Sequence, residues 1–242
     1  MKIYVIGIGS GRADEITNHA KNAIDSSDII VGYTYYIGLI SDLVKGKETL
    51  STGMMGEIER CKLAIDHALG GKTVSVVSSG DAGVYGMASI VLELAENYPQ
   101  LKVEVIPGIT AACSGGAVLG APVAHDFAVI SLSDLLTDWG LIEKRIAYAV
   151  QGDFVITLYN PSSKKRSDYL KKACEIIMQN TDIDLNCGIV KNIGRDGEFS
   201  EIMPLSELKN YKADMFTTVF IGNSQTKVIA GRLVTPRGYV VA

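Results

Sequence analysis

The sequence predicts an α/β protein made of two α/β domains, the first with a mostly parallel sheet and the second with a mixed sheet. In the first half, apolar runs of strand length alternate with stretches of helical spacing, and glycines follow the runs. In the second half, strand patterns crowd toward the C-terminus. The chain has 242 residues, of which 47% are hydrophobic, so it can bury a sizeable core. We expect domains at 1–121 and 122–242, with a linker around 120–126.

The first elements have clear starts and stops. Residues 3–8 form a continuous apolar run that ends in glycines, which is typical of a central parallel strand. Residues 57–69 have amphipathic spacing and are followed by Gly70 and Gly71, a good helix stop. The same criteria predict strands at 3–8, 28–32, 48–51, 73–78, 102–106, 127–132, 154–159, 187–192, 198–203, 217–221 and 232–234, and helices at 14–25, 35–43, 57–69, 86–97, 110–119, 139–149 and 164–180.

Composition excludes several classes of protein. A formal net charge of −4 argues against nucleic acid as the main partner, because phosphate binding depends on clustered Lys and Arg. The four cysteines are widely spaced and form no cluster with histidine, so we expect no metal site, no disulfide framework and a cytoplasmic location. The uncharged stretch 105–124 is interrupted by prolines and glycines, which predicts a buried loop–helix–loop and no membrane partner.

A glycine turn follows the first predicted strand. Residues 7–11 read G-x-G-x-G, and such a turn lets the backbone approach a ligand closely. A dinucleotide site would need G-x-G-x-x-G, but Arg12 stands at the third glycine position. The second strand ends in Gly32 and Tyr33 rather than in an acidic residue. An NAD or FAD site is therefore disfavoured, while a tight turn without a ligand stays open.

Small polar segments follow several other predicted strands. They are residues 78–86, 107–112, 131–134 and 159–162. Each could be an isolated turn. Ligands of open α/β sheets bind outside the carboxyl ends of the strands, so the recurrence of these segments favours a shared cleft.

These segments carry a family resemblance. Residues 7–11, 79–86, 105–112 and 218–224 resemble, in order, the motifs of the tetrapyrrole methyltransferases. The resemblance implies two α/β domains with the active cleft between them, a homodimer, S-adenosylmethionine as methyl donor with S-adenosylhomocysteine as product, and an anionic tetrapyrrole as substrate. One departure is Ser10, where the family commonly has proline, so we expect a looser loop. By motif position, the implied cofactor contacts are Ser10, Ser79, Gly80, Asp81, Val84, Thr110, Ala111, Ser131, Ser133, Tyr159, Asn160, Asn192, Ile193 and Gly194.

Residues 121–137 and 158–163 resemble one branch of that family, the precorrin-3B and cobalt-factor III C17-methyltransferases. Asp138 departs from it, because the branch often has proline there. The branch implies methylation at C17 with contraction of the macrocycle, giving precorrin-4 or cobalt-factor IV. Whether the substrate carries cobalt stays open. Any cobalt would arrive within the substrate.

Ring contraction requires proton movement, so a general acid or base should lie near the cleft. The candidates are Asp81, His125 and Asp126. The alternative for Asp81 is that it caps the turn that follows it. The alternative for His125 is a structural or surface role.

An acidic substrate calls for cations. Lys164 and Arg166 open a predicted helix, where positive charge opposes the helix dipole, and Arg12 adjoins the first glycine turn. We expect Arg12, Lys164 and Arg166 to bind substrate, with a solvated helix end as the alternative for the latter two. Other readings remain: the same fold with another acceptor (another corrin position, a modified histidine or ribosomal RNA), a nucleotide-binding oxidoreductase, or a non-catalytic scaffold.

Overall fold

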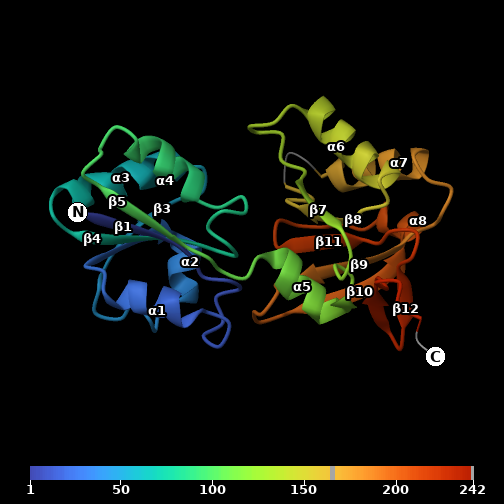
Figure 1. The fold of residues 1–242 in the computed structure, drawn as a ribbon, viewed down its shortest axis with the longest axis horizontal. Coiled ribbons are helices and arrows are strands. Elements are labelled where there is room, and N and C mark those ends of the chain that lie inside the picture. The colour runs from blue at the N-terminus through green and yellow to red at the C-terminus, as the bar shows by residue number, and fades with distance from the viewer. Residues whose placement is uncertain (164–166, 241–242) are drawn as a thin grey trace. The chain divides into compact units, whose positions relative to one another are not determined.

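The computed structural model describes residues 1–163 and 167–240. The chain divides into two compact units, Met1–Ala111 and Ala112–Ala242, and each is described by itself (Figure 1). This division falls earlier than residue 122. Helix α5 (Ala111–Leu119) packs on the second unit, since a Cβ added at Gly115 would lie 3.0 Å from the Phe220 ring.

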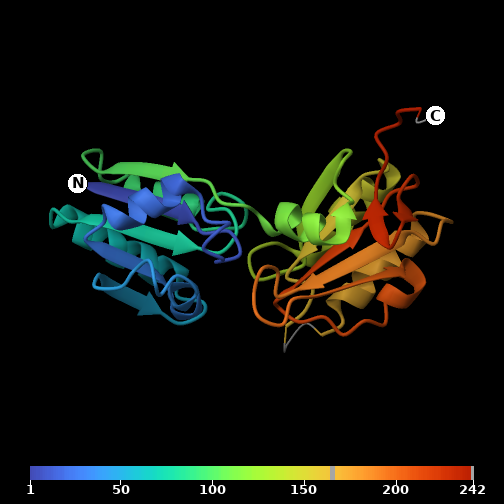
Figure 2. The ribbon, with the colours of Figure 1, turned by 90° about the horizontal axis from the view of Figure 1, so that it is seen from below.

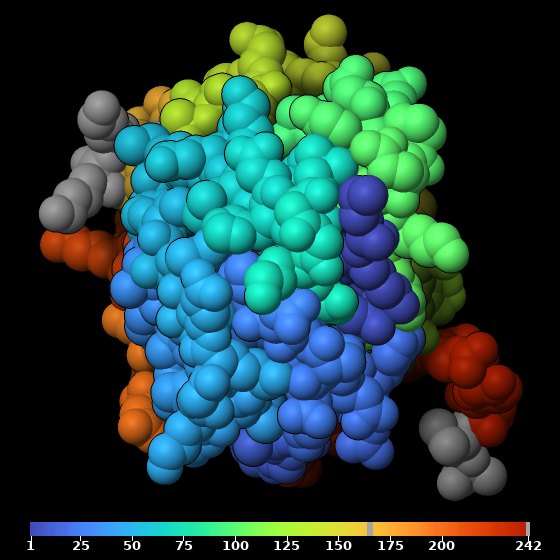
Figure 3. All heavy atoms as spheres, turned by 90° about the vertical axis from the view of Figure 1, so that its left-hand side faces the viewer, coloured from blue at the N-terminus to red at the C-terminus, as the bar shows by residue number. Residues whose placement is uncertain are grey.

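The first unit is built on a five-stranded sheet in the order β3-β2-β4-β1-β5, and every pair of neighbours is parallel (Figure 2). This confirms the parallel first sheet. Its amino-terminal edge, seen as the blue and cyan surface in Figure 3, is filled by side chains and shows no deep hollow. The strands and helices of this unit are β1 (Lys2–Gly7), α1 (Asn18–Asp25), β2 (Ile29–Tyr33), α2 (Thr34–Leu39), β3 (Glu48–Thr52), α3 (Glu57–Leu69), β4 (Thr73–Ser78), α4 (Ala88–Ala95) and β5 (Lys102–Ile106).

The first sheet is covered on both faces. Ile3 and Val5 pack in one apolar cluster with α3 and α4, and Ile6 packs in a second cluster with α1. Side chains alternate along a strand, so burial on both faces explains the continuous apolar run of β1. The helix expected at 14–25 begins only at Asn18, because the Thr17 hydroxyl accepts a hydrogen bond from the Ala20 N–H at 3.1 Å and caps it there.

The second unit contains a mixed five-stranded sheet in the order β10-β9-β11-β8-β7. Strands β7 and β8 pair in parallel, whereas β8 with β11, β11 with β9, and β9 with β10 pair antiparallel. Strands β7, β8 and β9 therefore run in the same direction. The strands and helices of this unit are α5, β6 (Gly120–Ala121), β7 (Phe127–Ser131), α6 (Trp139–Gln151), β8 (Val155–Tyr159), α7 (Tyr169–Gln179), β9 (Asn186–Lys191), β10 (Phe199–Pro204), α8 (Leu205–Leu208), β11 (Thr217–Ile221), β12 (Lys227–Ile229) and β13 (Arg232–Val234).

This sheet too has two covered faces (Figure 1). Helices α6, α7 and α8 bury one apolar cluster, and Leu119 of α5, Val190, Phe220 and Leu233 form another. Three short elements escape the sequence patterns, namely β6, α8 and β12. Strands β12, β13 and β6 form a separate small sheet, whose pairing depends on residues distant in the chain. In the described part of the chain, no helix has both the length and the apolarity to cross a membrane.

The second unit should depend strongly on Phe220, which is fully buried. We expect Phe220→Ala to lower the free energy of unfolding by about 3–5 kcal/mol, because it leaves a cavity. Trp139 is the only tryptophan and packs against the α6–α7 cluster, so its fluorescence during denaturant unfolding reports on this unit. Phe199→Ala, at a half-exposed position, is the matched control and should change stability by less than about 0.5 kcal/mol. Equal losses in the two variants would contradict the assignment of this core.

Candidate functional site

The topology of the first sheet marks one place for a ligand. Strands β1 and β4 are neighbours, but the chain leaves β1 through α1 on one face and leaves β4 through α4 on the other. The carboxyl ends of two such strands diverge into a crevice, which is where open α/β sheets bind ligands. The segments 7–11 and 79–86 begin there.

The turns after β1 and β4 are joined through their backbones. The Gly9 N–H donates to the Gly80 carbonyl at 3.0 Å, and the Gly80 N–H donates to the Gly9 carbonyl at 2.8 Å. Both glycines have positive φ values, 60° and 67°, which other residues rarely adopt. A Cβ built on either glycine would meet no atom nearer than 3.7 Å. A side chain at either position would make ordinary van der Waals contacts, so the positive φ, rather than a lack of space, favours glycine there.

The turn after β5 closes against these two. A Cβ added at Gly108 would lie 2.2 Å from the Gly80 carbonyl oxygen and 2.5 Å from that of Gly7. A Cβ added at Gly7 would lie 2.6 Å from the Gly80 oxygen. No side chain fits at either contact. The backbones that follow β1, β4 and β5 are therefore in direct contact, with no side chain between them.

Asp81 fastens two of these turns together. Its carboxylate accepts the Gly83 N–H at 2.8 Å through Oδ1 and the Gly108 N–H at 2.9 Å through Oδ2. Each oxygen is thus engaged by a backbone donor. This arrangement agrees with the capping role weighed for Asp81, and its cofactor and acid–base roles stay predictions.

Hydroxyl groups line the same strand ends. Ser10 is buried, donates to the Glu15 carboxylate and accepts the Arg12 N–H at 3.2 Å. Ser10, which stands where the resemblance expects proline, thus makes hydrogen bonds within its turn; that the loop is looser stays a prediction. The Ser79 hydroxyl donates to the Gly9 carbonyl at 3.4 Å. Thr110, Ala111 and Val84, the other first-half cofactor candidates, are half-buried.

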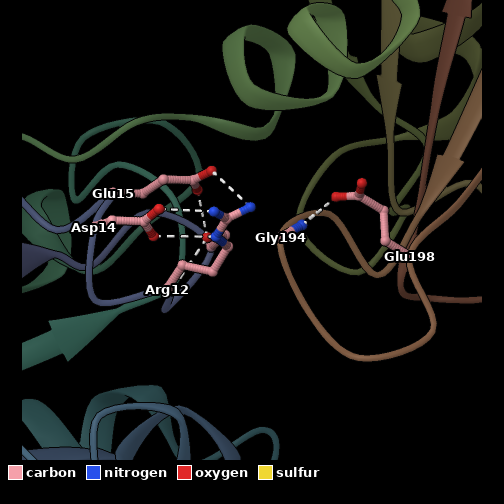
Figure 4. Close-up of polar contacts among 6 residues, drawn as sticks. Arg12, Asp14, Glu15, Gly194 and Glu198 are labelled. Atoms are coloured by element: carbon pink, nitrogen blue, oxygen red, sulfur yellow. Dashed lines mark hydrogen bonds and ion pairs between the residues drawn. The ribbon is translucent and has the colours of Figure 1, made fainter.

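Arg12 turns toward acidic neighbours (Figure 4). It binds the Asp14 carboxylate through Nη2 at 2.7 Å and Nε at 3.1 Å, and its Nη1 lies 3.9 Å from Glu15. The guanidinium lowers the pKa of Asp14 by hydrogen bonding. The charge expected to meet substrate is therefore partly compensated within its own turn.

In the second unit, the carboxyl ends of β7, β8 and β9 share one edge. Asn160, with φ 52°, donates from Nδ2 to the Ser131 hydroxyl at 2.9 Å, and that hydroxyl also accepts the Ser133 N–H at 3.2 Å. The Tyr159 hydroxyl accepts the Ala112 N–H at 2.7 Å, which satisfies a donor at the start of α5. The structure brings these candidates together.

The turn after β9 lies at that edge as well. Asn192, with φ 51°, donates its N–H to the Phe216 carbonyl at 3.1 Å. The Gly194 N–H donates to Glu198 Oε2 at 2.6 Å (Figure 4). Ile193 is half-buried between them. Sequence reasoning missed Glu198, which fixes this turn.

Sequence reasoning also missed an ion pair, which lies beside the start of β11. Lys191 Nζ lies 2.6 Å from Asp214 Oδ2, and Asp214 Oδ1 accepts the Phe216 N–H and the Thr217 hydroxyl, both at 2.9 Å. Burial alone would raise the pKa of Asp214, but these hydrogen bonds outweigh it and lower that pKa below its usual range.

His125 and Asp126 lie elsewhere. They precede β7, whereas Ser131 ends it, so they stand at the opposite edge of the sheet, about 16 Å away for a strand of this length. His125 is exposed, and its Nδ1 accepts the Asp126 N–H at 2.9 Å. Within the second unit, the structure does not bring them to the turns after β7, β8 and β9, and their acid–base roles stay predictions. Lys164 and Arg166 lie outside the described residues.

Comparison with known proteins places these features in a family. The family of tetrapyrrole (corrin/porphyrin) methylases matches residues 2–209. An Archaeoglobus fulgidus protein named cobalamin biosynthesis protein CbiHC is 44% identical over 98% of this chain and 53% of its own length, so the chain spans about half of that relative. A Salmonella typhimurium protein named probable cobalt-factor III C(17)-methyltransferase is 43% identical over 99% of this chain and 100% of its own.

Solved structures confirm the fold. The crystal structure of the methyltransferase CobJ matches with a TM-score of 0.89 and 33% identity over 97% of this chain and 99% of that one. A uroporphyrin-III C-methyltransferase from Thermus thermophilus, complexed with S-adenyl homocysteine, matches with a TM-score of 0.71 and 17% identity over 92% of this chain and 97% of that one. The second likeness shows the fold alone.

The contact at Gly108 allows a direct test. Gly108→Ala should lower the stability of the first unit by about 3 kcal/mol or more, because the added methyl group would overlap the carbonyl oxygens of Gly7 and Gly80. Far-UV circular dichroism during denaturant unfolding, set against Trp139 fluorescence from the second unit, measures the loss. Gly38→Ala is the control: nothing lies within 4 Å of its Cβ in helix α2, so stability should rise by about 0.5–1 kcal/mol. A tolerated alanine at 108 would refute the backbone contact.

The Asp214 network predicts a pH dependence. The pKa of Asp214 is lowered in the folded state, so the stability it adds is present above the unfolded-state pKa of about 3.9 and is lost as pH falls through the lower folded value. The free energy of unfolding of wild type should therefore fall more between pH 6 and pH 3 than that of Asp214→Asn. Urea unfolding at each pH measures both. The exposed Asp42→Asn should behave as wild type. Parallel acid profiles for wild type and Asp214→Asn would contradict the network.

Proposed function

The chain belongs to the family of tetrapyrrole (corrin/porphyrin) methylases, and from that premise we propose that it transfers a methyl group from S-adenosylmethionine to C17 of cobalt-factor III, with contraction of the macrocycle to cobalt-factor IV. The observation that carries this proposal is 43% identity, along the whole length of both chains, to the Salmonella protein named for that reaction. The names of two archaeal relatives, 43% and 44% identical, point to the same acceptor.

The residues at the first-unit strand ends suit such a donor. The molecule presents an amino acid and a nucleoside, which neutral hydrogen-bonding groups can hold. The turns after β1 and β4 carry backbone groups at Gly9 and Gly80; Ser79 adjoins Gly80 in the sequence, and Thr110 lies beside it in space, its Cα 3.8 Å from a Cβ built on Gly80. We propose that the cofactor is held by Ser10, Ser79, Gly80, Asp81, Val84, Thr110, Ala111, Ser131, Ser133, Tyr159, Asn160, Asn192, Ile193 and Gly194.

The protein's contribution to the reaction is chiefly alignment. When bound, S-adenosylmethionine supplies a methyl group on a positively charged sulfur, which is already activated for displacement. The hydrogen-bonded glycine turns fix the position of the backbone that we propose binds the donor. Holding two reactants in register can lower the reaction barrier by about 7–11 kcal/mol. No nucleophilic side chain is required. Residues at the ends of β1, β4 and β5 would hold this donor, whose displacement at the methyl carbon would leave the bonding electron pair on the sulfur.

The proposal extends to the setting of the enzyme. All four cysteines are unpaired, and three of them are buried. Burial raises the pKa of Cys61 to about 11 and that of Cys174 to about 12, so these thiols stay protonated and unreactive. Free thiols suit a reducing cytoplasm. We propose a cytoplasmic location on this ground. We propose a homodimer by the family resemblance.

Methyl transfer can be tested directly. The purified protein is incubated with methyl-labelled S-adenosylmethionine and, separately, with cobalt-factor III, precorrin-3B and ribosomal RNA. We expect label in the product of cobalt-factor III, with the mass and absorbance of a contracted ring. Label in RNA alone, or tight NAD(P) binding without any binding of S-adenosylhomocysteine, would overturn the proposal. Label in the product of precorrin-3B alone would change the proposed substrate from cobalt-factor III to its metal-free counterpart.

A further inference from the structure

The first unit buries a cation, Arg60, that takes no part in the glycine turns. Arg60 on α3 is only 4% exposed. Its Nε donates to the Thr52 hydroxyl at 3.0 Å, its Nη2 to the Gly53 carbonyl at 3.0 Å and its Nη1 to Met87 Sδ at 3.6 Å. Within residues 1–163 and 167–240, no carboxylate forms an ion pair with it.

This environment is unusual for arginine. Burying a charge is costly unless an opposite charge compensates it. A guanidinium has five N–H groups, and three of them have partners among the described residues, one a weak thioether acceptor. The unused donors and the missing counter-charge leave Arg60 able to bind a carboxylate.

A short segment contacts this arginine. We call residues 53–56 (Gly-Met-Met-Gly) the methionine turn. Arg60 holds both of its ends, because its Nη2 binds the Gly53 carbonyl and its backbone N–H binds the Gly56 carbonyl at 2.9 Å. Met54 is 54% exposed and Met55 78%. Met55 has φ 65°, a conformation that costs a non-glycine residue about 1–3 kcal/mol.

The methionine turn stands at the same sheet edge as the glycine turns. It follows the carboxyl end of β3, and β3 is separated from β4 by β2 alone, so the two strand ends lie about 10 Å apart. Met87, which contacts Arg60, comes directly after the segment 79–86. The turn therefore shares the sheet edge proposed for the methyl donor, about 10 Å from the end of β4.

We propose that the methionine turn and Arg60 form a binding surface for the acceptor macrocycle. Met54 and Met55 contact its apolar face, since methionine packs adaptably against conjugated rings. Arg60 pairs with one peripheral carboxylate when the turn shifts, and relief of the strain at Met55 lowers the cost of that shift. This inference rests on the proposed function, because it takes a large acidic tetrapyrrole as the ligand.

Binding without turnover separates this inference from the proposed function. Cobalt-factor III is titrated into the protein in saturating S-adenosylhomocysteine, and binding is followed by absorbance. We expect Arg60→Met to weaken cobalt-factor III at least tenfold and to reduce the salt dependence of its Kd, while calorimetry shows unchanged S-adenosylhomocysteine affinity. Arg60→Lys should be intermediate, since it keeps the charge but loses the planar fork. Arg145→Met, at an exposed site on α6, is the matched control and should bind as wild type.

A second variant guards against misfolding of Arg60→Met. Met54→Ser with Met55→Ser changes only exposed side chains, so the fold should persist and cobalt-factor III affinity should still fall about tenfold. Wild-type affinity in both sets of variants would overturn the inference and assign Arg60 a purely structural role. If wild type binds cobalt-factor III without methylating it, the proposed function fails and the inference stands. If wild type does not bind it at all, both fail.

Discussion

The turns after β1, β4 and β5 approach one another more closely than any side chain would permit. Gly108 meets the carbonyl oxygens of Gly7 and Gly80 at distances that leave no room for a Cβ, and Gly9 and Gly80 exchange backbone hydrogen bonds. Much else in the first unit follows from this contact. Asp81 is placed where both of its oxygens receive N–H groups from the joined turns. Gly9 and Gly80 follow the carboxyl ends of β1 and β4, the edge at which open α/β sheets bind ligands.

In the second unit, the directions of the strands bring several turns to one edge of the sheet. Because β11 pairs antiparallel with both β8 and β9, the carboxyl ends of β7, β8 and β9 fall on one edge. Side chains fix these turns where the first unit uses glycine contacts. Tyr159 satisfies the start of α5, and Asn160 binds Ser131. Two sequence motifs that are separated by α6 and β8 thereby form one hydrogen-bonded structure.

The sequence predicted most strands, because burial on both faces of a sheet requires continuous apolar runs such as residues 3–8. It could not place β12 or β6, whose pairing depends on partners far away in the chain. It also missed Glu198 and Asp214, since a carboxylate that fixes a turn resembles any surface charge until its partner is known. Two signals were available. His125 precedes a predicted strand, so the sequence could have placed it at the amino-terminal edge of the sheet. Arg60 lies on the apolar face of its helix with Ala64 and Ala68, which could have predicted that it is buried.

The local arrangement of cations explains how a chain with net charge −4 can suit an acidic ligand. Arg12 is engaged by Asp14, and Lys191 by Asp214, so the charges of these two cations are at least partly compensated. Arg60 differs, because burial removes it from solvent while its partners are neutral. An uncompensated charge in a low-dielectric setting attracts an anion more strongly than an exposed one does. Selectivity for an acidic macrocycle can therefore reside in one buried guanidinium without a basic surface, and the overall acidity of the chain then discourages nucleic acids from the same edge.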